Sequence, residues 1–374
     1  MRGTRAVRVL AGAFVLLVGS VAVVGPLAAP AGAATFNVTN TNDSGAGSLR
    51  QALTDAATTP GDDTVVIQAG LGTITLSTPI GWSGTDGAVT ITGNGNTVNL
   101  NGNPVGLDDE SNAGITVDNL TLSGGGGTTA LDAAPVLAES ASVVLTNCTI
   151  TNNHVTSTGG DVAGGVLSEG GSVSITDCTI TDNSGTSSGD AAGGVLSEGG
   201  SVDVSGSTIT GNTGSTDDGD AAGGIASEGG PVVVTTSTVS GNTVTVSSGG
   251  GDVGGGILSE GGSVTFRTVT DDCNTASTAG DSTDAGGGIL SEGGDVTTNG
   301  GSIVGNRATA TGGGTAGNSV LVFAGTKSLG DTTVSDDTTT CTAAPTTTTT
   351  APASTTTSAA AAAQAVAATP AFTG

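Results

Sequence analysis

The sequence predicts an all-β protein built as a single parallel β-helix, because it is periodic, poor in aromatic residues and patterned like short strands. A phrase that ends in glutamate occurs six times, at Glu139, Glu169, Glu198, Glu228, Glu260 and Glu292. The differences between successive numbers are 30, 29, 30, 32 and 32, a period typical of solenoids. With 67 Gly, 5 Phe, 1 Trp and no Tyr in 374 residues, the core must be stacked Val, Ile and Leu. Each coil then packs only on its neighbours.

The first element, residues 1–33, is a predicted signal peptide. Arg2, Arg5 and Arg8 precede an apolar run, and Ala31-Gly-Ala33 offers the small residues that signal peptidase requires. A membrane anchor is the alternative, but the run is short and ends at Pro26. We therefore expect no membrane span in the mature chain and a secreted or cell-wall-associated protein.

Charge narrows the class of partner. Without the first segment, 4 basic residues remain against 33 acidic ones, a formal charge of 4 − 33 = −29. Nucleic acids and anionic membranes attract proteins through clustered Lys and Arg, so neither is an expected partner. Divalent cations and basic partners stay open, beside the plain interpretation that an acidic surface keeps an exported protein soluble.

The segment of about residues 35–57 is predicted to cap the first coil. A strand from Phe36 to Val38 leads into a short helix, with Ser48 as its N-cap. The apolar face of this helix is formed by Leu49, Ala52, Leu53 and Ala56. A solenoid end that is not covered would expose an unpaired strand edge.

Residues 34–337 are expected to form the β-helix, and the coil 161–190 shows its plan. Strands and turns are predicted at Val166, Gly170-Gly171, Ser172–Thr176, Cys178–Thr181 and Asp182-Asn183. Alternation points Val173, Ile175 and Ile180 inward. A loop of variable length precedes the next Gly pair and absorbs the differences in period. One turn repeats as a predicted structural ladder of Asn153, Asn183, Asn212, Asn242 and Asn306.

Two motifs resemble a known group. Gly47-Ser-Leu-Arg-Gln-Ala-Leu53 resembles the CSLREAI motif at the start of many exported bacterial right-handed β-helix proteins. The Gly-Gly-aliphatic phrases and Thr-Ile-Thr-Gly-Asn212 resemble their repeats and, more distantly, those of chlamydial polymorphic outer-membrane proteins, which carry Phe where this chain has Thr. The resemblance implies a right-handed coil, the pectate-lyase-like superfold and a surface location. It carries over no catalytic residue.

Residue types weigh against catalysis. Enzymes that resemble pectate lyase use a basic residue beside a Ca²⁺-binding carboxylate cluster, and only Arg267, Arg307 and Lys327 follow Arg50. Aromatic platforms for sugars are nearly absent, and the single histidine, His154, has no nucleophile-elbow sequence to serve. No catalytic residue is predicted. A polysaccharide lyase or hydrolase is the alternative.

Acidic columns are the first candidate for binding. An aspartate lies eight residues before five of the repeated glutamates, at Asp161, Asp190, Asp220, Asp252 and Asp284. Both sets should stack at about 4.8 Å, and like charges so close repel unless they are solvated or bridged by a cation. Ca²⁺ is the natural candidate, although the nonapeptide that builds buried Ca²⁺ sites is missing. No other cofactor is expected.

A stripe of leucines faces outward beside the glutamates, at Leu137, Leu167, Leu196, Leu258 and Leu290. It predicts either a partner surface or a face covered by the variable loops, and we prefer the second.

A hydroxyl ladder is a separate hypothesis. Outward pairs recur at Thr149, Thr151, Thr179, Thr181, Thr208 and Thr210, followed by Thr238/Ser240 and Thr268/Thr270. They resemble the Thr-x-Thr arrays of ice-binding β-helices, although Thr is a common outward strand residue. Ser302-Ile-Val304 interrupts the pattern.

Four cysteines in an exported chain favour oxidation. Cys148 and Cys178 occupy the same position one coil apart, where either a disulfide or a buried thiol pair fits. Cys273 and Cys341 would tie the C-terminal end of the solenoid.

Residues 338–374 are a Thr/Ala/Pro-rich stretch that predicts a disordered stalk. Its end, Pro370-Ala-Phe-Thr-Gly374, resembles Gram-positive sorting signals without their leucine and apolar tail. Taken together, the sequence predicts a non-catalytic extracellular protein for adhesion or ligand binding through side-chain ladders, with a glycan or cell-surface partner. Ice binding is a further alternative.

Overall fold

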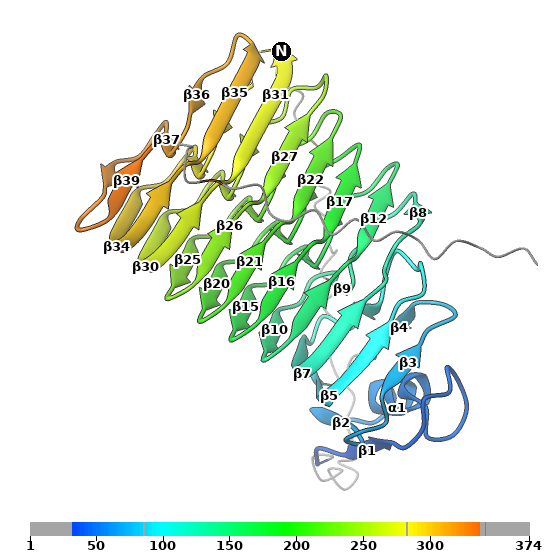
Figure 1. The fold of residues 1–374 in the computed structure, drawn as a ribbon. Coiled ribbons are helices and arrows are strands. Elements are labelled where there is room, and N and C mark those ends of the chain that lie inside the picture. Colours follow the sequence, from blue (N-terminus) through cyan, green and yellow to red (C-terminus); the bar gives the residue numbers. More distant parts are fainter. Residues whose placement is uncertain (1–31, 85–86, 282, 337–340, 342–374) are drawn as a thin grey trace, which may run out of the picture.

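The computed structural model describes residues 32–84, 87–281, 283–336 and 341, which form an all-β parallel solenoid of about 10 turns with one short helix (Figure 1). The predicted fold class is confirmed. The predicted signal peptide lies outside the described residues except for its last two positions, and the predicted stalk lies outside them except for Cys341. Within the described ranges, no helix has the length and apolar character needed to cross a membrane.

The coils stack into four sheets, which we call sheets A, B, C and D, within the described part of the chain. Sheet A contains β1 (Thr35–Val38), β2 (Asp63–Ile67), β3 (Thr73–Thr75), β5 (Val89–Asn99), β7 (Ile115–Ser123), β10 (Val143–Thr146), β11 (Thr149–Thr151), β15 (Val173–Thr176), β16 (Thr179–Thr181), β20 (Val202–Ser205), β21 (Thr208–Thr210), β25 (Val232–Thr235), β26 (Thr238–Ser240), β30 (Val264–Asp272), β34 (Val296–Val304), β38 (Lys327–Ser328) and β39 (Thr333–Ser335). Sheet B contains β4 (Ile80–Trp82), β6 (Leu107–Asp109), β9 (Val136–Ala138), β14 (Val166–Ser168), β19 (Val195–Ser197), β24 (Ile225–Ser227), β29 (Ile257–Ser259), β33 (Ile289–Ser291) and β37 (Val320–Val322).

The two smaller sheets come from the variable part of each coil. Sheet C contains β8 (Thr128–Thr129), β12 (His154–Ser157), β17 (Ser184–Ser187), β22 (Thr213–Thr216), β27 (Thr243–Val246), β31 (Thr275–Asp281) and β35 (Arg307–Gly312). Sheet D contains β13 (Val162–Ala163), β18 (Ala191–Ala192), β23 (Ala221–Ala222), β28 (Val253–Gly254), β32 (Ala285–Gly286) and β36 (Ala316–Gly317).

The N-terminal cap forms as predicted. Helix α1 (Leu49–Ala57) begins after Ser48, whose Oγ accepts the backbone N–H of Gln51 at 3.2 Å. Its residues Leu49, Ala52, Leu53 and Ala56 are buried and join the main core beside β1 and β2. The start of the solenoid is therefore covered by an apolar helix face.

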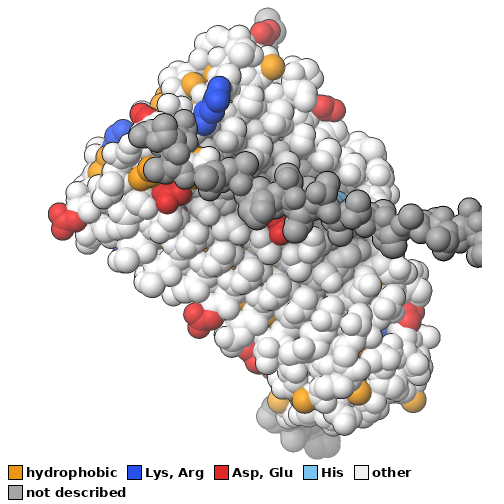
Figure 2. Space-filling model, viewed as in Figure 1, with side chains coloured by type: hydrophobic (Ala, Val, Ile, Leu, Met, Phe, Trp, Pro, Cys, Tyr) orange, Lys and Arg blue, Asp and Glu red, His pale blue; other side chains and the backbone are white. Residues whose placement is uncertain are grey.

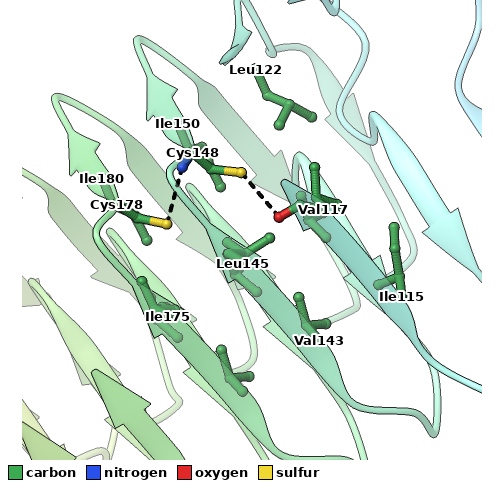
Figure 3. Close-up of a cluster of buried hydrophobic side chains, with 14 of the residues drawn as sticks. Ile115, Val117, Leu122, Val143, Leu145, Cys148, Ile150, Ile175, Cys178 and Ile180 are labelled. Atoms are coloured by element: carbon green, nitrogen blue, oxygen red, sulfur yellow. Dashed lines mark hydrogen bonds between the residues drawn. The ribbon is translucent and has the colours of Figure 1, made fainter. Parts of the chain in front are cut away.

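The main core lies inside the coil, between sheets A and B. The inward residues predicted from alternation, Val173, Ile175 and Ile180, are all fully buried. Figure 3 shows how such residues from neighbouring coils stack on one another. Glycines after sheet D let the coils approach closely, because a Cβ on Gly165 would lie 2.6 Å from the carbonyl oxygen of Gly194.

Sheet D covers the outward face of sheet B and explains the leucine stripe. The five leucines are at most 3% exposed and pack against Ala134, Ala163, Ala192 and Ala222. The covered alternative is thus correct, and the variable segment provides the cover as the short strands of sheet D. The other side of sheet D packs on sheet C, through residues such as Ala221, Val253, Val244 and Ala276. We call sheets C and D together the flap.

The asparagine ladder is structural. Asn212 Nδ2 donates to the carbonyl of Ile180 at 2.9 Å and to Asn242 Oδ1 at 3.1 Å, and its Oδ1 accepts the backbone N–H and Nδ2 of Asn183, both at 3.1 Å. Asn274 joins the five predicted members at the same corner. All six are at most 1% exposed, so their hydrogen bonds replace those that water would make.

One coil departs from the predicted register. Thr270, not Thr268, pairs with Thr238, and Asp272 pairs with Ser240. Thr268 adopts a positive φ of 55°, at the turn that Thr236 makes one coil earlier. The prediction of an outward Thr268/Thr270 pair is therefore wrong by two residues, and Asp271 points into the core.

The cysteines divide into two pairs. Cys273 and Cys341 form a disulfide with a Cα–Cα distance of 5.5 Å, at the end where the sequence had placed a tie. Cys148 and Cys178 are free, buried thiols in one column, and the backbone N–H of Cys148 donates to Cys178 Sγ at 3.2 Å (Figure 3). Of the two alternatives for this pair, the structure has the thiols.

Candidate functional site

The two acidic columns meet at one edge of the flap. Within a coil, sheet D runs into sheet B through a Gly-Gly turn, so the aspartate before sheet D and the glutamate after sheet B come to the same edge. Each glutamate reaches the aspartate of the preceding coil, not that of its own. The pairs are Glu169–Asp132, Glu198–Asp161, Glu228–Asp190, Glu260–Asp220 and Glu292–Asp252. We call these columns the carboxyl ladder; Asp132 is a member that the sequence did not reveal.

The aspartates are held by the backbone. Asp190 Oδ1 accepts the N–H of Asp220 at 2.8 Å, and Asp161 Oδ1 accepts the N–H of Asp190 at 2.7 Å. The same bond recurs in every coil from Asp132 to Asp284. The backbone N–H thus fixes the position of each aspartate carboxyl beside its glutamate.

Burial, together with the neighbouring carboxylates, raises the pKa of every glutamate of these pairs. The pKa is about 8 for Glu169 and Glu198, where burial is the largest cause, and about 9 for Glu228 and 10 for Glu260, for the same reason. For Glu292 the hydrogen bond with Asp252 comes first, and the pKa is about 8. At pH 7 the glutamates therefore carry protons and donate them to the aspartates. Repulsion in the columns is relieved by shared protons.

Three carboxyls of the ladder are close enough together to hold a cation. Carboxylate oxygens of Asp252, Asp284 and Glu292 lie within 4.8 Å of one another and are the described residues best placed to hold Ca²⁺. The hydrogen bond between Glu292 and Asp252 raises the pKa of Glu292 and is the alternative to a bound cation at this place. The ladder joins successive coils beside the buried Leu–Ala layer, and whether it also binds a ligand stays a prediction.

The predicted hydroxyl ladder is longer than the sequence suggested. Its first column runs through all coils of sheet A that the structure describes from β3 to β39, and contains Thr73, Thr97, Thr121, Thr149, Thr179, Thr208, Thr238, Thr270, Ser302 and Thr333. Every member is partly or fully exposed. The expected interruption at Ser302 does not occur in this column, because Ser302 keeps the hydroxyl.

A second column runs beside the first, two residues further along each strand. It contains Thr75, Asn99, Ser123, Thr151, Thr181, Thr210, Ser240, Asp272, Val304 and Ser335. The expected interruption occurs in this column, where Asp272 and Val304 replace the hydroxyl residues. The hydroxyls of Thr181 and Thr210 lie 3.3 Å apart. We call the two columns the threonine face. Figure 2 shows few charged side chains over β16, β21 and β26.

Sheet C adds hydroxyls that sequence reasoning missed. Its outward column contains Thr128, Thr156, Thr186, Ser215, Thr245, Ser277 and Thr309. From Thr156 on, each of these residues lies 17 positions after a repeated glutamate and three after a ladder asparagine. The signal was therefore present in the sequence, at the start of the segment that was interpreted as a loop.

The remaining residues considered from the sequence are His154, Trp82 and Phe266. His154 is exposed, and its Nδ1 lies 2.9 Å from Ser184 Oγ. Trp82 and Phe266 are 4% and 1% exposed, so neither offers a stacking surface for a sugar. The threonine face can therefore act through hydrogen bonds and methyl contacts rather than through aromatic stacking.

Comparisons with known proteins found no matching protein family, curated protein or solved structure.

Proposed function

We propose that the protein is a non-catalytic extracellular binding protein that holds a repetitive polar ligand, such as a cell-surface glycan, against its threonine face. The observation that carries this proposal is the unbroken first column, which offers a hydroxyl in ten successive coils. Strand spacing sets these hydroxyls about 4.8 Å apart. A ligand with a matching repeat would meet many identical weak contacts at once.

The chemistry of threonine supports binding by such a surface. A β-branched side chain on a strand has few accessible χ1 rotamers, so its hydroxyl is held in place before the ligand arrives. Preorganisation lowers the entropic cost of binding, which matters when each contact contributes little. The surface over this part of sheet A also carries few charges that would have to be desolvated (Figure 2).

The motif Gly47–Leu53 and the coil plan support kinship with exported β-helix proteins of the pectate-lyase-like superfold. We include this kinship, export by a signal peptide and attachment through the C-terminal stretch in the proposal. Each of these would place the threonine face outside the cell, where glycans are accessible. An exported protein of this superfold could also cleave a polysaccharide, and the experiment below measures that outcome.

Ice is a second candidate ligand. Regular rows of stiff hydroxyl and methyl groups with few charges suit an ordered water lattice as well as a sugar polymer, and the length of the first column favours it. Thermal hysteresis and inhibition of ice recrystallisation would be measured on the purified mature protein. If Thr208→Tyr loses this activity and the control variant Thr158→Tyr keeps it, the threonine face binds ice.

The binding experiment uses the mature protein and a panel of insoluble polysaccharides, including cellulose, chitin and peptidoglycan. Thr208→Tyr places a bulky ring in the middle of the first column and should reduce the retained fraction at least tenfold on the polymer that binds. Thr158→Tyr is the matched control, because Thr158 is exposed in the turn before sheet D, away from the face. Equal retention of both variants would contradict the proposal, and new reducing ends or unsaturated products would replace it with the enzyme alternative.

A further inference from the structure

A groove opens where the flap ends. Sheet B continues through β6 and β4, but sheet D reaches only as far as Ala133, which bridges Val162. The outward face of sheet B is therefore uncovered in these first coils. A cavity of about 330 Å³ lies at this step, and we call it the step groove.

The step groove is mainly apolar on its walls. Pro79, Pro104, Val105 and Leu137 line it, together with Leu131, which is 73% exposed. An exposed leucine at the rim of a cavity leaves apolar surface that a partner could cover. The other residues of the groove are Asp108, Glu110, Thr129, Asp132 and Glu139.

The register explains why carboxylates gather on the floor of the groove. In the column that holds the buried leucines, Leu137 is followed by Asp108 and then by Gly81. A Cβ on Gly81 would lie 3.3 Å from Glu110 Oε1 and 3.7 Å from Asp108 Oδ2, so both carboxyls lean over the space that the missing side chain leaves. At the step groove, the column of buried leucines thus ends at Leu137 and continues with the acidic residue Asp108.

Asp108 is the most constrained of these groups. Its Oδ1 is buried without a hydrogen-bond partner. Burial, followed by the charges of Glu110 and Glu139, raises the pKa of Asp108 to about 7. Unlike the glutamates of the carboxyl ladder, Asp108 has no hydrogen bond to a neighbouring carboxyl among the described residues. A cation placed in the groove would neutralise several carboxylates at once.

We propose that the step groove binds the lysine side chain of a partner polypeptide, with the ammonium among Asp108, Glu110 and Glu139 and the methylene stem along Leu137 and the prolines. Charge complementarity favours a cation, and the apolar walls favour one on an aliphatic stem over a hydrated metal ion. A neutral sugar could donate hydrogen bonds to these carboxylates but would not neutralise their charge. The lysine of this chain, Lys327, lies on β38 at the other end of the solenoid (Figure 1), so the partner is a separate molecule.

The test is calorimetric titration of the mature protein at pH 7 with an acetylated and amidated Gly-Lys-Gly peptide. The matched peptide with norleucine keeps the stem and lacks the ammonium. We expect the lysine peptide to bind at least tenfold more tightly than the norleucine peptide, and Asp108→Asn to remove this difference. Asp203→Asn, an exposed aspartate on β20, is the control variant and should bind like the wild type.

Proton release and NMR shifts provide two further tests of lysine binding in the step groove. Binding should release protons at pH 7, because the ammonium draws Asp108 into its charged form, and titrations in buffers of different ionisation enthalpy measure this release. Amide signals of Leu131 and Glu139 should shift in NMR spectra on addition of the lysine peptide. Equal binding of both peptides, or wild-type binding by Asp108→Asn, would overturn the proposal. Binding of 1,5-diaminopentane or Ca²⁺ without binding of the lysine peptide would overturn the assignment to a protein partner. Thr208→Tyr leaves this groove untouched, so the result is independent of the proposed function.

Discussion

Replacing Glu228 by glutamine tests whether the carboxyl ladder shares protons. Glu228 lies in the middle of the ladder, its Oε1 is buried without a partner, and burial raises its pKa from 4.5 to about 9 beside Asp190. The folded protein therefore keeps a proton that the unfolded chain releases above pH 4.5. The stabilisation from this group is complete below pH 4.5 and is lost as the pH rises towards 9. A glutamine amide can donate to Asp190 at every pH.

The magnitude follows from proton linkage. One proton held only by the folded state changes the free energy of unfolding by about 1.4 kcal/mol per pH unit, or about 3 kcal/mol between pH 5.5 and 8. Because Glu228 is partly exposed, solvent screening makes this an upper bound. We expect Glu228→Gln to match the wild type near pH 5 and to be more stable at pH 8.

The assay is guanidinium unfolding followed by circular dichroism at several pH values. Asp203→Asn is the control, because Asp203 is exposed on β20 and lies outside the carboxyl ladder. It should leave the pH slope unchanged. If Glu228→Gln unfolds with the same pH slope as the wild type, the glutamate carries no shared proton and the interpretation of the ladder fails.

Three further predictions concern stability. Asn212→Ala removes four buried hydrogen bonds and should cost about 4 kcal/mol of unfolding free energy at about 1 kcal/mol each, measured by denaturation against the exposed control Thr245→Ala. Asp271→Val should stabilise the protein, most strongly above pH 7, because burial raises the pKa of Asp271 to about 8. Asn274 Nδ2 would still donate to the carbonyl of Val239 and to Asn306 Oδ1. Lower stability of the variant at pH 8 would refute this. Cys341→Ser removes the disulfide that closes a loop of 68 residues, and the greater chain entropy of the unfolded state should lower the free energy of unfolding by about 4 kcal/mol. Amide hydrogen exchange should become faster in β34 and β39 and stay unchanged in β15 and β20.

Much of the fold could be predicted because a stacked coil repeats its constraints. The inward parity of Val173, Ile175 and Ile180, the cap helix and the asparagine corner each depend on local patterns that the sequence displays directly. The flap could not be predicted, since strands of two residues such as Ala191–Ala192 are too short to show alternation. Because the flap was not predicted, a covered leucine stripe remained one of two alternatives, beside a partner surface.

The candidate sites were predicted less completely, for physical reasons. The proton-sharing pairs join a glutamate to the aspartate of the preceding coil, and that offset depends on how sheet D folds back on sheet B. Asn274 and Asp271 were missed because Thr268 takes a turn position and shifts the apparent pattern by two residues. The step groove depends on where the flap stops, which no single motif marks.

The central claim is that the threonine face binds the ligand while the carboxyl ladder supports the fold. One retention measurement tests it most directly: the wild type, Thr208→Tyr and Glu228→Gln applied side by side, at pH 7, to the polymer or ice surface that the wild type binds. The account predicts that Thr208→Tyr is lost to the wash and that Glu228→Gln is retained like the wild type. Retention of Thr208→Tyr together with loss of Glu228→Gln would contradict it.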